Sequence, residues 1–397
     1  MITIPQALKI VAREVTPLRS ERIDIADAVG RVLAEDMVAD IDLPPFDRSQ
    51  MDGYAVRAAD TANVPVDLVI VGESAAGRGW DGKLKKGEAV RIMTGARVPV
   101  GADAVQKVEV TKELGGVVTI FETVKRGMSV VKRGSEVKKG RRLLRAGDLI
   151  TTHNIATLAS FGYAKVRVAK MPRVAILSTG SEIVDINKRP RKDQIRNSNS
   201  VMLASMTASA GGLPTIFPHV GDTLTEITTA IRQAAKSTDV LVITGGVSVG
   251  KYDLTKDALA SLGAEPFFDK VALKPGKPTV FGRLGKTLIF GLPGNPVSAA
   301  VTFHLFVRRV ILAMQGACEK SCPTGYAIAK RDVRGTRDRD AYLPATLSTD
   351  KHGRLIVDAV KGTGSSDLVS LGQAQVLVLI PRGTALKEGE PVKILYL

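Results

Sequence analysis

The feature that most constrains the fold is an alternation of apolar runs and helical segments between residues 172 and 314. The apolar runs are RVAILSTG, TIFPHV, DVLVITGG and TLIFGLPG, which begin at residues 173, 215, 239 and 287. Helices are expected near residues 198–210, 224–236, 253–263 and 296–314. Strands that alternate with helices of this size predict an open parallel α/β sheet. Ligands of such sheets bind beside the carboxyl ends of the strands, where the glycine clusters lie.

Shorter β-rich runs flank this region on both sides. Four of them lie within residues 65–145, separated by glycines and lysines, and two more (VLVLIP and PVKILYL) lie within residues 320–397. Helices are expected at residues 5–15 and 152–161, the second closed by Gly162. The predicted fold is a multidomain α/β plus β chain with a central open parallel α/β sheet and a small C-terminal β domain.

Length and boundaries suggest four domains. The 397 residues are too many for one ordinary core. We expect a discontinuous N-terminal linker domain at 1–43 and 146–171, a β-rich domain at 44–145, the α/β domain at 172–317 and a C-terminal β domain at 318–397.

The charge favours an anionic partner. The chain has 56 Lys and Arg against 40 Asp and Glu, a formal net charge of +16. Nucleic acid, an acidic surface and a small phosphorylated molecule would all be attracted. Aromatic residues are only 4%, and no basic stretch is interleaved with them, which argues against nucleic acid.

Cysteine usage and hydropathy are typical of a cytoplasmic protein without a membrane span. Cys318 and Cys322 lack a second cysteine pair or a nearby histidine to complete a zinc site, so free thiols are expected. No signal-peptide pattern is evident, and no apolar run approaches the ~20 residues that cross a bilayer.

Two glycine-rich loops follow buried strands. The first contains Gly245, Gly246 and Ser248, before a helix that begins near Asp253. Glycines let backbone N–H groups approach a phosphate, and a helix N-terminus adds positive potential. The loop lacks the spacing and the Lys-Ser/Thr end of a Walker motif, so a plain strand-to-helix turn is the alternative.

The second loop is GLPGNPVSAAV. Pro293 and Gly294 precede Asn295, which can cap a helix, and Pro296 stands at the first helical position. This order predicts a helix whose first N–H groups point into the crevice at the strand ends, although an ordinary capped helix has the same pattern.

Charged residues accompany these loops. Lys270, Lys274 and Lys277 surround a Pro-Gly turn and favour a phosphate or oxyanion site, with a solvated turn as the alternative. Thr179, Ser181 and Glu182 end the first strand of the α/β domain.

Acidic residues in the β-rich domain need an explanation, because the chain as a whole is strongly basic. Asp47 and Asp52 occur in PPFDRSQMDGYAV, a stretch too broken for a regular helix. Such acids suit a bound metal ion. We expect Asp47 to anchor its own loop and Asp103 to be a turn residue.

Seven stretches, in this order, resemble the molybdopterin molybdenumtransferases, which include bacterial and archaeal enzymes and the C-terminal domain of gephyrin. The stretches are PPFDRSQMDGYAV, RIMTGARVPVGADAV, KRGSEV, LSTGSEIV, GGVSVGKYD, KPGKP and GLPGNPVSA. The resemblance covers essentially the whole chain. It implies transfer of molybdate to adenylylated molybdopterin, with Mg²⁺-assisted cleavage of the pyrophosphate link and release of AMP. It also implies an elongated homodimer whose active sites are shared between subunits, and a transient contact with the molybdopterin adenylyltransferase.

The resemblance also assigns roles to residues. Catalytic roles would fall to Asp52, Thr94, Glu136, Glu182, Asp253, Lys270 and Lys274. Substrate would be bound by Asp222, Gly245, Gly246, Ser248, Lys277, Pro293, Gly294, Asn295 and Pro296. Mg²⁺ would be held by Asp52 and Glu182. Many relatives have an aspartate at the position of Glu136.

Three alternatives stay open on the sequence. Molybdopterin adenylyltransferases share the α/β domain, but they are usually short single domains without the MDGYA stretch. A non-catalytic scaffold of the same fold would not need Asp52, Glu182 and Asp253. A paralogue that inserts tungstate is indistinguishable, because molybdate and tungstate are near-identical tetrahedral dianions.

Overall fold

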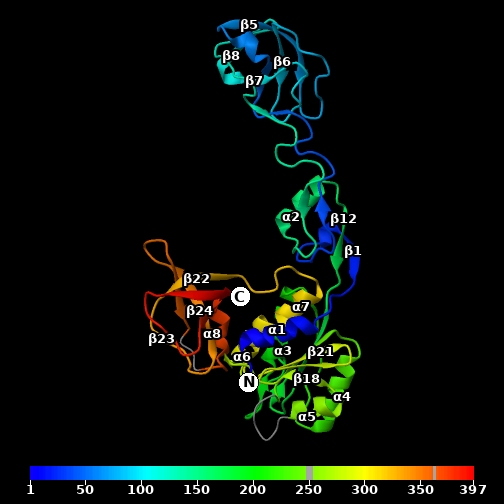
Figure 1. Ribbon diagram of the computed structural model, residues 1–397, viewed down its shortest axis with the longest axis vertical. Helices are drawn as coiled ribbons and strands as arrows, with labels where there is room; N and C mark the ends of the chain where they lie inside the picture. The colour runs from blue at the N-terminus through cyan, green and yellow to red at the C-terminus, as the bar shows by residue number, and fades with distance from the viewer. Residues whose placement is uncertain (247–253, 361–363) are drawn as a thin grey trace. The chain divides into compact units, whose positions relative to one another are not determined.

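The chain forms two compact units, each described here by itself (Figure 1). The computed structural model describes residues 1–246, 254–360 and 364–397. The first unit comprises Met1–Glu35, Ala146–Thr152 and Lys165–Leu397, and the second comprises Asp36–Arg145 and His153–Ala164.

A six-stranded sheet organises the first unit, in the order β16-β13-β17-β21-β20-β18. The strands are β13 (Arg173–Ser178), β16 (Leu213–Ile216), β17 (Val240–Thr244), β18 (Glu265–Phe268), β20 (Val280–Leu284) and β21 (Thr287–Leu292). The first four strands of that order are parallel, which confirms the predicted sheet. β20 and β18 run antiparallel to their neighbours. A tight turn through Gly285 (φ +59°) folds β20 and β21 into a hairpin, so in this sheet β20 runs against the four parallel strands.

The strand expected over TIFPHV is shorter and starts earlier than predicted. β16 ends at Ile216. Pro218 has no backbone N–H and cannot continue the ladder, and only an isolated bridge joins Thr179 to Val220 beyond it.

Helices cover both faces of this sheet. On one face α4 (Leu224–Ala235) and α5 (Leu254–Ser261) pack against Ala175, Leu177 and Ile243. On the other face α1 (Ile4–Glu14), α3 (Ser198–Ser209) and the helix from residue 296 pack against Val174 and Ile176. Successive side chains of a strand point to opposite faces, so both sets of neighbours on β13 are buried. This two-sided burial explains why the strands are apolar runs without alternation.

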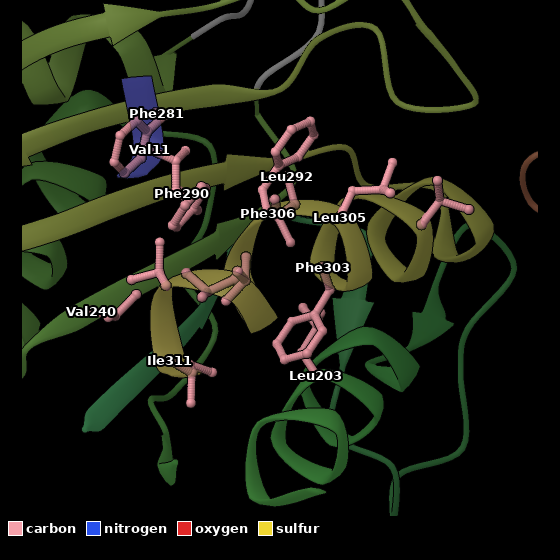
Figure 2. Packing of buried hydrophobic residues seen from close by; sticks show 14 of the residues in the cluster. Val11, Leu203, Val240, Phe281, Phe290, Leu292, Phe303, Leu305, Phe306 and Ile311 are labelled. Atoms are coloured by element: carbon pink, nitrogen blue, oxygen red, sulfur yellow. The ribbon is translucent and has the colours of Figure 1, made fainter. Parts of the chain in front are cut away.

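The longest apolar helix is the centre of the larger core. It consists of α6 (Pro296–Thr302), a π-helical segment η4 (Phe303–Val307) and α7 (Arg308–Met314). By length and composition it could cross a membrane, but 78% of its apolar window is buried inside the protein. Figure 2 shows Phe303, Phe306 and Ile311 of this helix among the side chains of the core cluster. Its hydropathy is therefore accounted for by core packing.

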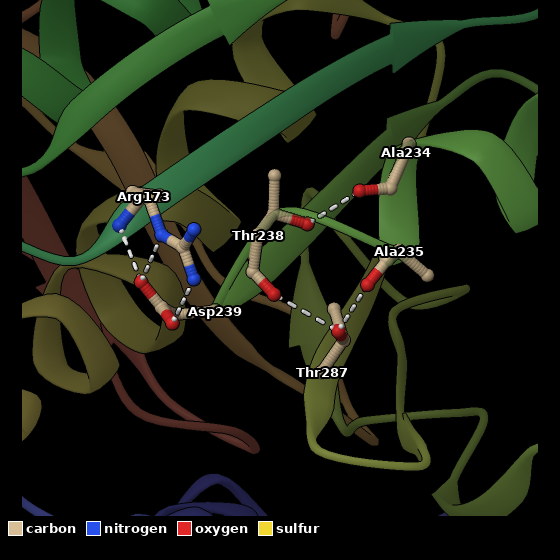
Figure 3. Close-up of polar contacts among 6 residues, drawn as sticks. All are labelled: Arg173, Ala234, Ala235, Thr238, Asp239 and Thr287. Carbon is tan, nitrogen blue, oxygen red and sulfur yellow. Dashed lines mark hydrogen bonds and ion pairs between the residues drawn. The ribbon is translucent and has the colours of Figure 1, made fainter.

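Polar contacts close the amino-terminal edge of the parallel strands (Figure 3). Arg173 at the start of β13 forms a bidentate ion pair with Asp239, which directly precedes β17. Thr287 at the start of β21 donates a hydrogen bond that is shared between the carbonyls of Ala235 and Thr238. The glycine turns lie at the opposite, carboxyl edge.

The C-terminal part of the first unit is a small β barrel with its own core. Its strands are β22 (Thr324–Ala329), β24 (Asp340–Thr349), β25 (Leu355–Ala359), β26 (Val376–Ile380) and β28 (Pro391–Tyr396). Their pairings close a ring, β24-β25-β22-β28-β26 and back to β24. β19 (Leu273–Lys274) adds to the edge of β24 and so ties the Pro-Gly turn of the α/β part to the barrel. The expected C-terminal β domain is confirmed.

The second unit is built on another six-stranded sheet, in the order β7-β4-β6-β5-β9-β8. The strands are β4 (Gly53–Val56), β5 (Val66–Ser74), β6 (Glu88–Ile92), β7 (Ala104–Lys107), β8 (Thr111–Leu114) and β9 (Val117–Ile120). Clusters of buried apolar residues lie on both of its faces. The β-rich texture of residues 65–145 is thereby confirmed.

Short elements connect the sheets. They are β1 (Ser20–Asp24), β2 (Met37–Val38), β3 (Arg48–Ser49), β10 (Val130–Val131), β11 (Arg142–Leu144), α2 (Thr152–Ser160), β12 (Lys165–Ala169), β14 (Ile183–Val184), β15 (Ile195–Arg196), β23 (Val333–Arg334), α8 (Leu368–Gln373) and β27 (Ala385–Leu386). Gly162, at φ +76°, follows α2 as expected. The four-domain division remains a prediction.

Candidate active site

A cavity of about 1150 Å³ lies at the carboxyl ends of the parallel strands of the first unit. Its wall is formed by the turns after β13, β17 and β21, by the Pro-Gly turn after β19, and by segments of the C-terminal barrel. The predicted site residues that line it are Glu182, Asp222, Gly245, Gly246, Lys274, Lys277, Pro293, Gly294, Asn295 and Pro296. Ser248 and Asp253 lie outside the described residues.

The turn after β13 presents Glu182 to solvent at the cavity. Gly180 has a φ of +141°, and a Cβ there would lie 2.5 Å from Oε2 of Glu182, so the carboxylate folds back over the glycine. Asp222 fixes the same turn, because its Oδ2 accepts hydrogen bonds from the backbone N–H of Ser181 (2.9 Å) and from its hydroxyl (2.8 Å). In this geometry Asp222 orients the turn, and both Asp222 and Glu182 are exposed at the cavity.

The turn after β17 requires glycine. Gly245 has a φ of +94°, and a Cβ there would lie 2.4 Å from the carbonyl oxygen of Thr179. Gly246 has a φ of +61°, and its Cβ would lie 2.5 Å from the hydroxyl of Thr255. The buried hydroxyls of Thr179 and Thr255 have no hydrogen-bond partner among the described residues. Close backbone approach at this turn was expected, whereas the unpaired hydroxyls beside it were not.

The loop after β21 differs from the prediction in two respects. Asn295 occupies the N-cap position of α6, but its side chain makes no capping bond and its amide donates to the hydroxyl of Ser365 instead (2.8 Å). The first N–H groups of the helix are also not all free, because the N–H of Val297 donates to the carbonyl of Ser365 (3.1 Å). Both corrections have one cause: a segment of the C-terminal barrel packs onto the helix start, which no local pattern reveals.

The lysines of the Pro-Gly turn separate into two groups. Lys274 and Lys277 are exposed and line the cavity. Lys270 was expected to act beside them, but it is not among the lining residues, and its carbonyl accepts a hydrogen bond from Ile2 (3.0 Å). The pairing of β19 with β24 holds the backbone of Lys274, and Arg339, one residue before β24, lines the same cavity.

Arg339 and Asn199 are among the lining residues that the sequence did not predict. The amide of Asn199 donates to the carbonyl of Gly294 (2.7 Å) and to the hydroxyl of Thr244 (3.1 Å). Its orientation is fixed, because the reversed amide would place an oxygen against the Gly294 carbonyl, which only accepts. Asn199 therefore ties the end of β17 to the loop after β21. The stretch IRNSNS gave a signal for the helix start but none for this long-range bond.

In the second unit, the structure brings together Asp52 and Thr94, which the family resemblance assigns to the same reaction. One oxygen of Asp52 accepts from the hydroxyl of Thr94 (2.7 Å) and from its backbone N–H (2.6 Å). The hydroxyl and then the N–H of Thr94 stabilise the ionised carboxylate and hold the pKa of Asp52 below its usual range. Glu136 is exposed and lies 3.5 Å from a guanidinium nitrogen of Arg48.

Asp47 and Asp103, the other two acids that the sequence analysis considered in the second unit, have structural partners. Asp47 accepts from the ammonium of Lys132 (2.7 Å) and from the backbone of Arg133 (2.8 Å), so it anchors its loop as expected. Asp103 accepts from the backbone of Ala58 (2.7 Å).

Family models match three successive parts of the chain. They are described as MoeA N-terminal region (domain I and II) at residues 2–162, probable molybdopterin binding domain at residues 175–313, and MoeA C-terminal region (domain IV) at residues 326–397. A Bacillus subtilis protein named molybdopterin molybdenumtransferase is 34% identical over 100% of this chain and 94% of its own length. The chain belongs to the molybdopterin molybdenumtransferase family.

Other relatives agree with this assignment. A molybdopterin molybdenumtransferase from Staphylococcus aureus (strain COL) is 32% identical over 99% of this chain and 95% of its own length. A crystal structure of a molybdopterin biosynthesis moeA protein from Pyrococcus horikoshii OT3 is 30% identical, covers 100% of both chains and superposes with a TM-score of 0.85. The multidomain architecture expected from the resemblance is thus that of solved members of this family.

The donor groups fit a magnesium ion that is held in part by its substrate. Among residues 1–246, 254–360 and 364–397, no three His, Cys, Asp or Glu side chains converge on one point. Mg²⁺ commonly uses only one or two carboxylates and takes the remaining ligands from phosphates and water. Glu182, exposed at the cavity beside cationic residues, is such a carboxylate.

Proposed function

We propose that this chain is a molybdopterin molybdenumtransferase that inserts molybdate into adenylylated molybdopterin, with cleavage of the pyrophosphate link and release of AMP. The observation that carries the proposal is the cavity at the strand ends, which combines exposed lysines with glycine turns in a chain of this family. The catalytic assignments of Asp52, Thr94, Glu136, Glu182 and Asp253 belong to this proposal.

The chain's own residues supply the means of binding two anionic substrates. Lys274, Lys277 and Arg339 provide charge-assisted donors for phosphate or molybdate oxygens. The turns at Gly180 and Gly245 let backbone approach the ligand without side-chain interference. Pro293 and Pro296 stiffen the loop between β21 and α6, so the wall keeps its shape when substrate binds.

Mg²⁺ belongs to the proposal as the cation that neutralises phosphate oxygens. Glu182 would hold it in the first unit, and Asp52, kept ionised by Thr94, is the second carboxylate we assign to it. We further propose a homodimer with shared sites, a cytoplasmic location and transient contact with the molybdopterin adenylyltransferase. No role with nucleic acid or membranes is proposed.

The direct test is AMP release from adenylylated molybdopterin in the presence of Mg²⁺ and molybdate. We expect release that depends on both additions and stops when the metal is chelated. Asp52→Asn should fold normally and release little AMP. Release no faster than without protein would reject the transferase and favour a scaffold of the same fold. Parallel assays with tungstate decide which oxyanion is preferred.

A further inference from the structure

The wall of the cavity continues into a basic arm, defined here as residues 185–194, with the sequence DINKRPRKDQ. The arm joins β14 to β15, two short strands that pair with each other in parallel. Ile183 at its start and Ile195 and Arg196 at its end line the cavity. The arm is therefore a loop whose two ends adjoin residues that line the cavity.

Hydrogen bonds hold the arm in a defined course. At its base, the N–H of Ile195 donates to the carbonyl of Glu182 (2.9 Å) and the N–H of Asn197 to that of Val184 (2.8 Å). Across its middle, Nε of Arg196 donates to the carbonyl of Lys188 (3.1 Å). The arm accordingly follows a defined course between two strands that border the cavity, instead of being a free loop.

Most of the positive charge on the arm is unpaired. Its four basic residues outnumber two acidic ones. Lys188 pairs with Asp185 at 3.2 Å, and His219 lies 3.6 Å from the other oxygen of Asp185. Arg189, Arg191 and Lys192 are exposed, and no described residue forms an ion pair with them. Cations that stabilise no partner of their own remain available to a ligand in solution.

We propose that the basic arm steers the anionic substrate into the cavity. The inference rests on the proposed function, because it takes the phosphoanhydride-bearing substrate as the ligand. The wall itself carries the acids Glu182 and Asp222 beside its cations, which weakens its long-range attraction for anions. The exposed cations of the arm offset those acids at the mouth, before the substrate reaches the lysines inside.

The expected effect is on the rate of association and not on chemistry. Charges within about one Debye length of the entrance, ~8 Å at physiological salt, raise the local concentration of an oppositely charged ligand. A residue that never contacts the bound substrate leaves kcat unchanged. Steering also weakens as salt is added, whereas a direct contact in a desolvated site persists.

The test compares two triple variants that remove the same charge. The arm variant is Arg189→Gln/Arg191→Gln/Lys192→Gln. The control is Arg232→Gln/Lys236→Gln/Lys286→Gln, whose residues are exposed in the same unit. Lys236 and Lys286 adjoin Ala235 and Thr287, at the closed amino-terminal edge of the sheet (Figure 3). Association of adenylylated molybdopterin is followed by stopped-flow fluorescence at low and high ionic strength, and AMP release gives kcat and KM.

The proposal expects the arm variant to associate roughly three- to tenfold more slowly at low ionic strength, with kcat unchanged and the difference lost at high salt. The control should stay within about twofold of the original protein. Equal effects of both variants, or none, overturn the proposal, and so does a salt-independent fall in kcat. If the original protein releases no AMP, the proposed function fails, while the association rates still decide whether the arm steers this anion.

Discussion

At the scale of the residue, Asp52 shows how a polar neighbour prepares a carboxylate. Both hydrogen bonds from Thr94 reach the same oxygen, so the other oxygen is not used by this partner. Both bonds favour the ionised form over the protonated one. The carboxylate is thus kept charged over a wider range of pH than an ordinary aspartate.

Removing the hydroxyl of Thr94 should raise the pKa of Asp52. In Thr94→Val the backbone N–H remains, but the largest of the two stabilising contacts is lost. Because the folded pKa is depressed, protonation of Asp52 should then begin at a higher pH than in the original protein. Carboxyl NMR titration measures this directly. Thr111→Val is the control, since that hydroxyl donates to the carbonyl of Val108 and to no carboxylate. An unchanged titration of Asp52 in Thr94→Val would contradict the assignment.

Lys274 is the residue on which anion binding should depend most directly. A charge-assisted contact is worth ~1.5–3 kcal/mol, so Lys274→Ala should weaken binding of adenylylated molybdopterin roughly 10- to 150-fold. The melting temperature should hardly change, because the side chain is exposed. Calorimetric titration measures the affinity, with Lys286→Ala as a lysine control at the opposite edge of the sheet. Equal affinities for both variants would reject Lys274 as a site residue.

At the scale of the element, the turn after β17 lies close against two other segments of the first unit. Its two glycines, at φ +94° and +61°, lie against Thr179 and Thr255. Glycine is needed where the backbone at a strand end contacts a ligand, because any side chain would occupy the space between them.

Two costs of a side chain at Gly245 can be measured separately: the steric clash of its Cβ with Thr179 and the strain of a positive φ. Gly245→Ala should destabilise the first unit by roughly 2–5 kcal/mol, from a positive φ and a Cβ placed against the Thr179 carbonyl. Gly263→Ala is the matched control: its φ is +74°, but nothing lies within 4 Å of the added Cβ. It should cost only about 1–2 kcal/mol. Both glycines lie in the same unit, so denaturant unfolding compares them through one transition. Equal losses would show that the contact with Thr179 does not matter.

At the scale of the whole molecule, the residues assigned to the reaction belong to two compact units. Asp52, Thr94 and Glu136 are in the second unit, and Glu182 and Lys274 are in the first. The proposed shared sites of a homodimer would bring one group from each subunit together.

Subunit mixing tests that proposal. Asp52→Asn and Lys274→Ala should each release little AMP alone. If sites are shared, a hybrid dimer has one site with both mutations and one with neither, so mixing should restore part of the activity. Native mass spectrometry confirms that subunits exchange. Exchange without recovery would mean that each site is built from a single chain.

Local chemistry in the sequence was enough to predict several elements of this molecule. The apolar runs before Thr179 and Gly245 predicted buried parallel strands, because strands covered on both faces need apolar side chains throughout. Pro296 predicted the start of its helix, since its ring suits the first helical turn. Asp52 and Thr94 were both assigned to the reaction through a family resemblance carried by the motifs around them, but their contact was not predicted.

Tertiary structure decided what depends on segments far apart in the chain. The hairpin of β20 and β21 makes β20 run against the parallel strands of its sheet. A segment of the C-terminal barrel at Ser365 contacts the start of α6, where the sequence predicted a capping bond from Asn295 and free N–H groups. Lys270 and Lys274 lie in one short stretch, and nothing in the sequence separates them. Of these two lysines, only Lys274 lines the cavity. Asn199 and Arg339 reach the cavity through long-range contacts. A local pattern specifies the conformation a segment prefers, whereas its partners are set by how distant segments pack.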